Sequence, residues 1–470
     1  MGDRREAGYS PQRNFADEVP TMADFHLDIL GQQPRINKLY TQITFCFQLG
    51  SDSPSQTDIV NTLEKGFKCL SDNLPWIAGK IVNEDDTFKI RSSEKQSRVI
   101  VKHYDKNNQA PAWNTLLEAS FPFRMIDEST FAPCKTLEPS SDNLSVFLIQ
   151  ANFVSGGLLL TLNGQHGSMD MAGQGQIMYL LAKACRNEPF TSSEVSICNM
   201  DRRNIIPLLD DNGPNSADSR LPRNTSVASN IETPQRQAPP LPNCTWAYFS
   251  FAASSLATLK SLASASVPTG TNDFVSTDDV LSAFIWQFIS RSRLPRYQNE
   301  MSTCKTTLSR NVDVRRYLSI PSTYPGLVTN ATIHTSSLEY VVKQSLGTIA
   351  SQLRSALDPA SLNHRTRELA TAIARNKNAQ HAVAVPGGNP ELDVRLSSWA
   401  KENCYSLDFG FGFPSAVRRP RFAEGSREGL VYFLPKTLKG DIVVGVCLGD
   451  EDLERLKEDQ DFIQFGKFVG

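Results

Sequence analysis

The chain has 470 residues, of which 40% are hydrophobic and 21% are charged, and its formal net charge is -2. This length allows two or three ordinary domains, and the composition is typical of a folded, soluble protein. Because there is no basic excess, a nucleic-acid partner is not expected, and an anionic ligand must be held by a local cluster of Lys and Arg.

The cysteines and the N-terminal segment indicate the cellular compartment in which the protein is expected. Nine cysteines are scattered singly and no two form a C-x-x-C pair, which predicts free thiols in a reducing compartment. Residues 1–21 are polar and lack the apolar centre of a signal peptide, so we expect a disordered lead. No apolar run approaches the roughly 18 residues that a membrane span needs. We therefore expect a cytoplasmic monomer that contacts no membrane.

The first half of the chain mixes strands and helices. Residues 40–49 alternate β-branched and aromatic side chains with polar ones, which predicts a strand. A helix is expected over about 59–70, where apolar residues repeat every three or four positions. Residues 145–154 and 157–163 are two more expected strands, joined as a hairpin. These elements predict an N-terminal α/β domain over residues 22–206.

The composition changes after this domain. Residues 207–243 are rich in Pro, Ser, Asn and Asp, which is typical of an extended linker or crossover. The pattern of an α/β domain then resumes over residues 244–470. Its expected elements are a strand at 246–251, a helix at 254–265, an apolar helix over 280–288 with acidic residues before it, strands at 431–435 and 442–448, and a closing helix from about Glu451.

The segment most suited to chemistry is His166-Gly167-Ser168-Met169-Asp170. A buried strand leads into it and a helix-like stretch, 171–185, leads out. A neutral imidazole on such a loop can take a proton from a substrate, so His166 is the candidate general base. Asp170 begins the helix, and we expect it to anchor the loop by pairing with a basic side chain. With six histidines and 50 acidic residues in the chain, such a pair also arises by chance.

A second candidate segment is Asp408-Phe409-Gly410-Phe411-Gly412. Two glycines between aromatic residues allow a sharp turn, and that turn could either approach a ligand or simply fill an apolar gap. The basic residues that follow, Arg418, Arg419 and Arg421, could hold phosphate or could form a solvated loop.

Other chemistries fit the sequence less well. No third ligand stands at metal-site spacing from His166 and Asp170, so no metal is expected. Neither the G-x-S-x-G elbow of serine hydrolases nor the G-x-x-x-x-G-K-[ST] phosphate loop is present. The glycines near residue 166 do not form a dinucleotide fingerprint.

Together these segments resemble the BAHD acyltransferases, which carry H-x-x-x-D in mid-chain and D-F-G-W-G near the C-terminus. Three further segments look like motifs of that family: 275–286, 312–315 and 324–330. Within its fungal branch, the chain is similar to trichothecene 3-O-acetyltransferases over nearly all of its length beyond residue 22. The segments that carry this similarity are 27–32, 163–171, 274–286, 324–327, 396–401, 417–420 and 468–470.

The resemblance implies an α/β fold of two chloramphenicol-acetyltransferase-like domains, with mixed sheets, flanking helices and an active-site tunnel at their interface. It implies transfer of acetyl from the co-substrate acetyl-CoA to the C-3 hydroxyl of a trichothecene, with no bound cofactor. The alternative is acyl transfer to a different secondary-metabolite alcohol or amine. His166 is then the base in a ternary complex, while Asp170 is structural and Asp408 braces the fold through a basic partner, for which Arg315 is one candidate.

Residues of the CoA channel are also implied by the resemblance; the candidates are Ser276, Ser397, Trp399, Arg418 and Arg419. Two positions depart from the family pattern. Phe411 replaces the usual Trp and has no N–H to donate, and Phe413 replaces a frequent Lys.

Two other classes compete with this interpretation. A condensation-type domain acting on carrier-bound acyl groups usually has a second His where this chain has Gln165. A binding protein that lost turnover would not need to keep both His166 and Asp170.

Overall fold

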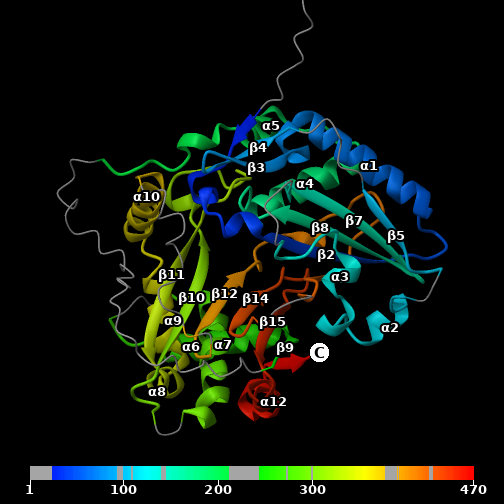
Figure 1. Ribbon diagram of the computed structural model, residues 1–470. Coiled ribbons are helices and arrows are strands. Elements are labelled where there is room, and N and C mark those ends of the chain that lie inside the picture. The colour runs from blue at the N-terminus through cyan, green and yellow to red at the C-terminus, as the bar shows by residue number, and fades with distance from the viewer. Residues whose placement is uncertain are drawn as a thin grey trace, which may run out of the picture.

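Figure 1 shows the computed structural model of the chain, in which two α/β halves lie against each other. The structure describes residues 24–470 except 93–98, 107–108, 139–143, 211–242, 271–273, 298–299, 376–388, 390 and 423–426. The predicted N-terminal lead and most of the predicted 207–243 linker therefore lie outside the described residues.

The strands and helices predicted for the first half are present, together with others that the sequence did not predict. Its strands are β1 (Asp24–His26), β2 (Tyr40–Gln48), β3 (Lys80–Glu84), β4 (Thr87–Arg91), β5 (Ile100–His103), β6 (Leu144–Ser145), β7 (Phe147–Val154) and β8 (Gly157–Gln165). Its helices are α1 (Gln56–Asn73), α2 (Trp113–Glu118), α3 (Glu128–Phe131), α4 (Met171–Cys185) and α5 (Ser192–Cys198). The predicted β7–β8 hairpin and the helix after Asp170 are confirmed.

The described strands of this half form two sheets. One has the order β1-β4-β3-β6, and the other has the order β13-β2-β8-β7-β5, in which β13 (Ala416–Arg418) comes from late in the chain. The apolar run of β8 is buried on both faces, which explains why it does not alternate. Leu158, Leu160 and Leu162 pack with the core beneath α1 and α4, whereas Leu159 packs with Trp113 on the other face. The strand β8 ends at Gln165, so His166 is the first residue beyond the sheet.

The second half is one mixed sheet with helices on one face (Figure 1). Its described strands are β9 (Cys244–Phe251), β10 (Lys305–Asp313), β11 (Thr329–Ser337), β12 (Val394–Ser398), β14 (Leu430–Phe433), β15 (Ile442–Gly449) and β16 (Gly466–Phe468), in the order β11-β10-β12-β14-β15-β9-β16. Its described helices are α6 (Ala253–Ala265), α7 (Thr277–Arg293), α8 (Leu338–Lys343), α9 (Leu346–Ser355), α10 (Pro359–Arg375), α12 (Asp450–Glu458) and α13 (Gln460–Ile463).

Segments of the second half form backbone hydrogen bonds with the first half. The strand β13 (Ala416–Arg418) comes from the second half but pairs with β2 in the sheet of the first half. The carbonyl of Gly470 accepts a hydrogen bond from the backbone N–H of Phe123 at 3.0 Å. The predicted boundary at residue 244 is therefore crossed, because a later strand completes the earlier sheet.

The start of the predicted crossover runs along α10. Arg367 donates to the carbonyl of Pro207 at 3.1 Å, and the N–H of Leu209 donates to Thr371 Oγ1 at 2.8 Å. Among the described residues, no helix is both long enough and apolar enough to cross a membrane.

Candidate active site

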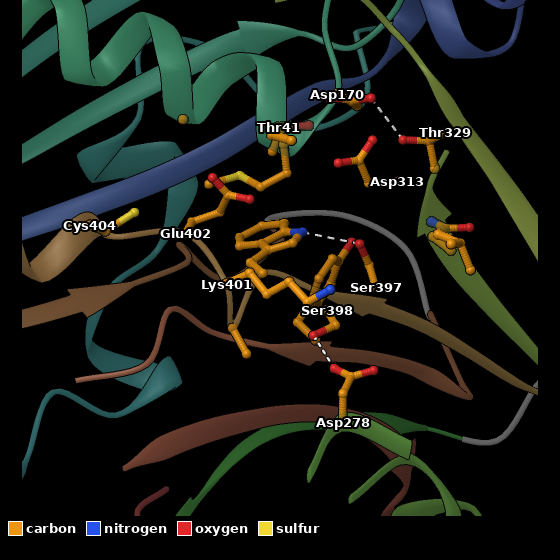
Figure 2. A pocket seen from close by; sticks show the side chains of 18 of the residues that line it. Thr41, Asp170, Asp278, Asp313, Thr329, Ser397, Ser398, Lys401, Glu402 and Cys404 are labelled. Atoms are coloured by element: carbon orange, nitrogen blue, oxygen red, sulfur yellow. Dashed lines mark hydrogen bonds between the residues drawn. The ribbon is translucent and has the colours of Figure 1, made fainter. Parts of the chain in front are cut away.

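A cavity of about 1530 Å³ lies between the two halves. The first half contributes Thr41 and His166 to its wall, and the second half contributes Ser397, Trp399 and Glu402. Figure 2 shows a close view, in which Thr41 from β2 stands opposite Ser397 and Ser398 from β12. The cavity therefore brings together segments that are more than 200 residues apart in the sequence.

The position of His166 fixes which ring nitrogen is basic. Its backbone N–H donates to the carbonyl of Leu39 at 2.8 Å, which ties the loop to the residue before β2. Its ring Nδ1 lies 3.2 Å from the carbonyl oxygen of Met169. Because a carbonyl oxygen can only accept, Nδ1 carries the proton and Nε2 keeps a free lone pair. His166 also lines the cavity, so Nε2 is available as a proton acceptor.

Burial lowers the pKa of His166 below its ordinary value of 6.5, although the Met169 carbonyl and the charge of Asp170 act in the opposite direction. The neutral imidazole is therefore the form present at pH 7. A neutral imidazole with a free Nε2 is the form that a general base requires.

This pKa shift predicts the acidic limb of the activity profile. Since the pKa of His166 is lowered, the base stays unprotonated as the pH falls, and kcat/KM should decline only below about pH 6.5. The measurement is release of free thiol from acetyl-CoA between pH 5 and 8, with stability of the protein checked at each pH. An acidic limb centred above pH 7 would contradict the prediction.

The carboxylate of Asp170 is fully occupied by hydrogen bonds. Its Oδ1 accepts from the N–H of Gly173 and from Arg315 Nη2, both at 2.9 Å. Its Oδ2 accepts from Arg315 Nη1 at 3.0 Å, from the N–H of Val328 at 2.8 Å and from Thr329 Oγ1 at 2.9 Å, the last drawn in Figure 2. Asp170 is thus the N-cap of α4 and one of the points where the two halves join.

Burial alone would raise the pKa of Asp170, but the adjacent Arg315 charge and the N–H donors hold it below its usual value. The sequence prediction that Asp170 pairs with a basic side chain is confirmed. That side chain is Arg315, which follows β10 at the start of a 3-10 helix (Arg315–Tyr317). Arg315 also donates to the carbonyls of Tyr324 and Gly326, at 2.9 and 2.7 Å.

The predicted pairing of Arg315 with Asp408 is therefore wrong. Arg315 is already used at Asp170, and Asp408 instead closes its own turn by accepting from the N–H groups of Gly410 and Gly412, at 2.7 and 2.9 Å. Both glycines have positive φ, 91° and 97°, which other residues rarely adopt. The basic group near Asp408 is Arg186, which donates to its backbone carbonyl.

The Asp408–Gly412 segment lies outside the cavity wall. The ring of Phe411 meets Phe47 edge to face with centroids 4.9 Å apart, and Phe409 is fully buried in the same core. The turn therefore positions apolar rings against β2. The lack of a Trp N–H at position 411 has no direct effect on the cavity.

The candidates for a CoA channel divide into two groups. Ser276, Ser397, Trp399 and Arg419 line the cavity. Ser276 caps α7 by accepting from the N–H of Asp279, and Ser397 Oγ accepts from Trp399 Nε1 at 3.0 Å (Figure 2).

Arg418 does not belong to the cavity wall, which corrects the expectation for this residue. Its buried guanidinium donates to the carbonyls of Ser120, Phe121 and Val417, at 2.9 to 3.0 Å. Ser120 and Phe121 have positive φ, so Arg418 stabilises an unusual turn of the first half.

Sequence reasoning missed Glu402, which lines the cavity and is drawn in Figure 2. Burial, together with the charges of Asp170 and Asp313, raises its pKa to about 8. The carboxylate lies against Gly175 of α4, where an added Cβ would lie 2.2 Å from Glu402 Oε2 as it is placed here. No local signal in the sequence marks it, since it stands in a polar loop.

The raised pKa of Glu402 predicts an alkaline limb. Glu402 is mostly protonated at pH 7 and becomes charged as the pH rises through about 8. The added negative charge opposes the negative charge that develops during acyl transfer, so kcat should fall above pH 8. The variant Glu402→Gln keeps the neutral form at all pH values and should lack this fall. An alkaline limb that persists unchanged in Glu402→Gln would contradict the prediction.

Comparison with known proteins identifies the family. Residues 39–185 match the family model of the trichothecene 3-O-acetyltransferase-like N-terminal domain. The chain is 45% identical over 461 residues to the O-acetyltransferase dmxR13 of Cryptosporiopsis sp., covering 95% of this chain and 98% of that protein. It is 42% identical to trichothecene 3-O-acetyltransferase TRI101 of Fusarium sporotrichioides, covering 95% and 97% of the two chains.

The fold agrees with these similarities. The crystal structure of F. sporotrichioides TRI101 complexed with Coenzyme A and T-2 superposes with a TM-score of 0.85 and 41% identity, covering 95% of this chain and 100% of that one. The chain therefore belongs to the BAHD-type O-acyltransferases and is an enzyme of that class. Within the class it lies close to the trichothecene 3-O-acetyltransferases, and the expected two-part α/β fold is confirmed.

Proposed function

We propose that this enzyme transfers acetyl from acetyl-CoA to the C-3 hydroxyl of a trichothecene. The observation that carries the proposal is the free Nε2 of His166 in a cavity shared by both halves. The 42% identity to a trichothecene 3-O-acetyltransferase supports this acceptor, and the structure of that relative is described as a complex with Coenzyme A and T-2.

The chemistry needs no covalent acyl-enzyme. His166 Nε2 takes the proton of the acceptor hydroxyl, and the oxygen attacks the thioester carbonyl carbon. The tetrahedral intermediate collapses by breaking the carbon–sulfur bond, and the imidazolium returns the proton to the departing CoA sulfur. Holding both substrates in one cavity supplies the proximity that makes a direct transfer sufficient.

We place the charged end of CoA near the start of α7. There the exposed ring of Phe274 has two cations near it, with Lys260 Nζ at 5.4 Å and the Arg354 guanidinium at 5.2 Å from its centroid. All three residues line the cavity together with Ser276. An exposed aromatic ring beside Lys260, and beside an arginine that also pairs with Asp279, suits a nucleotide.

A second candidate is acyl transfer to a different secondary-metabolite alcohol or amine. The observation that favours it is the 45% identity to dmxR13, which is named an O-acetyltransferase without a stated acceptor. The two candidates share the donor, the base and the reaction, and they differ only in what the acceptor side of the cavity admits.

The test is an acceptor panel with purified enzyme and acetyl-CoA. Release of free CoA thiol that depends on a trichothecene with a free C-3 hydroxyl, with a mass increase of one acetyl group in the product, is the expected result. Thiol release only with other alcohols or amines would support the second candidate. Binding of CoA without thiol release from any acceptor would contradict both.

A further inference from the structure

The loop that carries His166 is held by buried side chains that do not line the cavity. Gln165 Oε1 accepts from the N–H of Ser168 at 2.8 Å, and Gln165 Nε2 donates to the carbonyl of Asn37 at 2.8 Å. The carbonyl of Ser168 accepts from Arg202 Nη1 at 2.7 Å. Because neither Gln165 nor Arg202 belongs to the cavity wall, these groups shape the loop without reaching the place where a substrate would bind.

Arg202 reaches the loop from a separate segment of the chain. It is the first residue of a 3-10 helix (Arg202–Asn204) and lies 34 positions after Ser168. Its guanidinium is buried over the ring of Trp76, 4.2 Å from the centroid. Its Nη2 is buried and has no hydrogen-bond partner among the described residues. The hydrogen bond from Nη1 to the Ser168 carbonyl is therefore the main polar contact between this guanidinium and the loop.

The counter-charge of Arg202 is Asp28. Asp28 Oδ2 lies 3.6 Å from Arg202 Nη1, and its side chain is fully buried. The same carboxylate accepts from the hydroxyl of Tyr324 at 2.5 Å and from the N–H of Leu327 at 3.0 Å. The residue after Leu327 donates to Asp170. Asp28 thus ties Arg202 to the segment of the second half that also contacts the end of the His166 loop.

One peptide unit connects Arg202 with the orientation of His166. The Ser168 carbonyl and the N–H of Met169 belong to the same planar peptide bond. Arg202 holds the carbonyl, and the carbonyl of Gln165 accepts from the N–H at 3.3 Å. The next carbonyl, that of Met169, accepts from His166 Nδ1. Rotation of the held peptide would turn the Met169 carbonyl away from Nδ1 and release the imidazole.

We propose that Arg202 is a positioning residue for the general base His166, and that Asp28 holds Arg202 in place. The pair keeps the Met169 carbonyl directed at Nδ1. The hydrogen bond at one ring nitrogen decides which nitrogen carries the proton, so Nε2 stays free to accept the proton of the acceptor hydroxyl. This inference rests on the proposed function, since it assumes that His166 is the base.

The first measurement is steady-state thiol release with acetyl-CoA and a trichothecene that has a free C-3 hydroxyl. Arg202→Met keeps much of the length of the side chain and removes the donor. We expect kcat to fall about 10- to 10²-fold, the scale of a displaced catalytic group, while KM for acetyl-CoA changes by less than about 2-fold. Arg202→Lys keeps a cationic donor for the Ser168 carbonyl, so its kcat should lie between those of Arg202→Met and the wild type.

The second measurement is nuclear magnetic resonance of protein labelled at the histidine ring nitrogens, and it needs no turnover. The signals of His166 are assigned by their loss in His166→Gln. We expect the Nδ1–H tautomer in the wild type and a mixture of both tautomers in Arg202→Met. Asp28→Asn is the milder variant, because it keeps the shape of the side chain and removes only the charge beside Arg202. It should move kcat and the tautomer in the same direction by smaller amounts.

Arg293→Met is the matched control. Arg293 is also fully buried and lies 3.2 Å from the carboxylate of Glu428, but it does not line the cavity. It should lower the thermal stability as Arg202→Met does, and leave kcat and the tautomer of His166 unchanged. An equal loss of kcat in both variants overturns the proposal, because the loss would then follow from stability alone. If Arg202→Met does not fold, Asp28→Asn decides by the same two measurements, and wild-type values for both overturn the proposal.

The two measurements separate this inference from the proposed function. A mixture of tautomers in Arg202→Met, with no thiol release by the wild type from any acceptor, would uphold the positioning of the imidazole and sink the acetyltransferase proposal. Thiol release by the wild type, with kcat and the Nδ1–H tautomer unchanged in Arg202→Met, would do the reverse.

Discussion

Replacing His166 by alanine is expected to lower kcat for acetyl transfer by about 10²- to 10⁴-fold, the range found when a general base is lost. Nδ1 donates to the Met169 carbonyl and His166 lines the cavity, so Nε2 is the one ring nitrogen left to accept the proton. The carboxylate of Asp170 cannot take over the proton, because all its lone pairs already accept hydrogen bonds.

The matched control is His166→Gln, which keeps a donor for the Met169 carbonyl and nearly the same volume but cannot act as a base. Both variants should show the same loss of kcat in the thiol-release assay, while His166→Gln keeps the thermal stability of the wild type. If either variant kept more than about a tenth of the wild-type kcat, proton abstraction by His166 would not be the mechanism.

The local elements around the site follow from the sequence because their causes are local. An unbroken apolar run predicts the buried strand β8, and Asp170 before a helical pattern predicts the N-cap of α4. Together they place His166 on the loop between strand and helix before any coordinates are known.

The side chain that pairs with Asp170 could not be predicted in the same way. Arg315 reaches Asp170 across 145 positions of the chain, and no periodicity reports such a contact. The family resemblance made Asp408 a candidate partner of Arg315, and nothing in the sequence distinguishes Asp170 from the other 49 acidic residues for that role. The same limit hid Glu402, which becomes part of the cavity only when the two halves meet.

Arg418 shows a different limit of prediction from the sequence. A basic run near the C-terminus suggests an exposed or phosphate-binding segment, yet Arg418 is buried, and its guanidinium donates to backbone carbonyls of Ser120 and Phe121. The need for those donors arises from a turn with positive φ nearly 300 residues earlier in the chain. Charge in the sequence therefore does not reveal whether a guanidinium serves the fold or the ligand.

Removal of the Asp170 carboxylate is expected to have the largest effect on stability. The variant Asp170→Ala leaves Arg315 buried without its counter-charge, and loss of one partner of a buried ion pair costs about 3–5 kcal/mol of unfolding free energy. It also removes the acceptor for the N–H groups of Gly173 and Val328. The measurement is urea unfolding followed by circular dichroism, read as the shift of the first transition if the two halves unfold separately.

The conservative variant Asp170→Asn should not rescue this loss. Both carboxylate oxygens accept from N–H donors, so either orientation of an asparagine amide places its own NH₂ against Arg315.

In a double-mutant cycle, Asp170→Ala with Arg315→Ala should be less destabilising than the sum of the single variants, by about 1–3 kcal/mol. Because the pKa of Asp170 is lowered in the folded state, this contribution is complete at pH 7 and is lost only as the pH falls below about 4. Additive single effects, or an Asp170→Ala variant that is inactive yet as stable as the wild type, would mean that Asp170 acts in the chemistry and not as the joint between the halves.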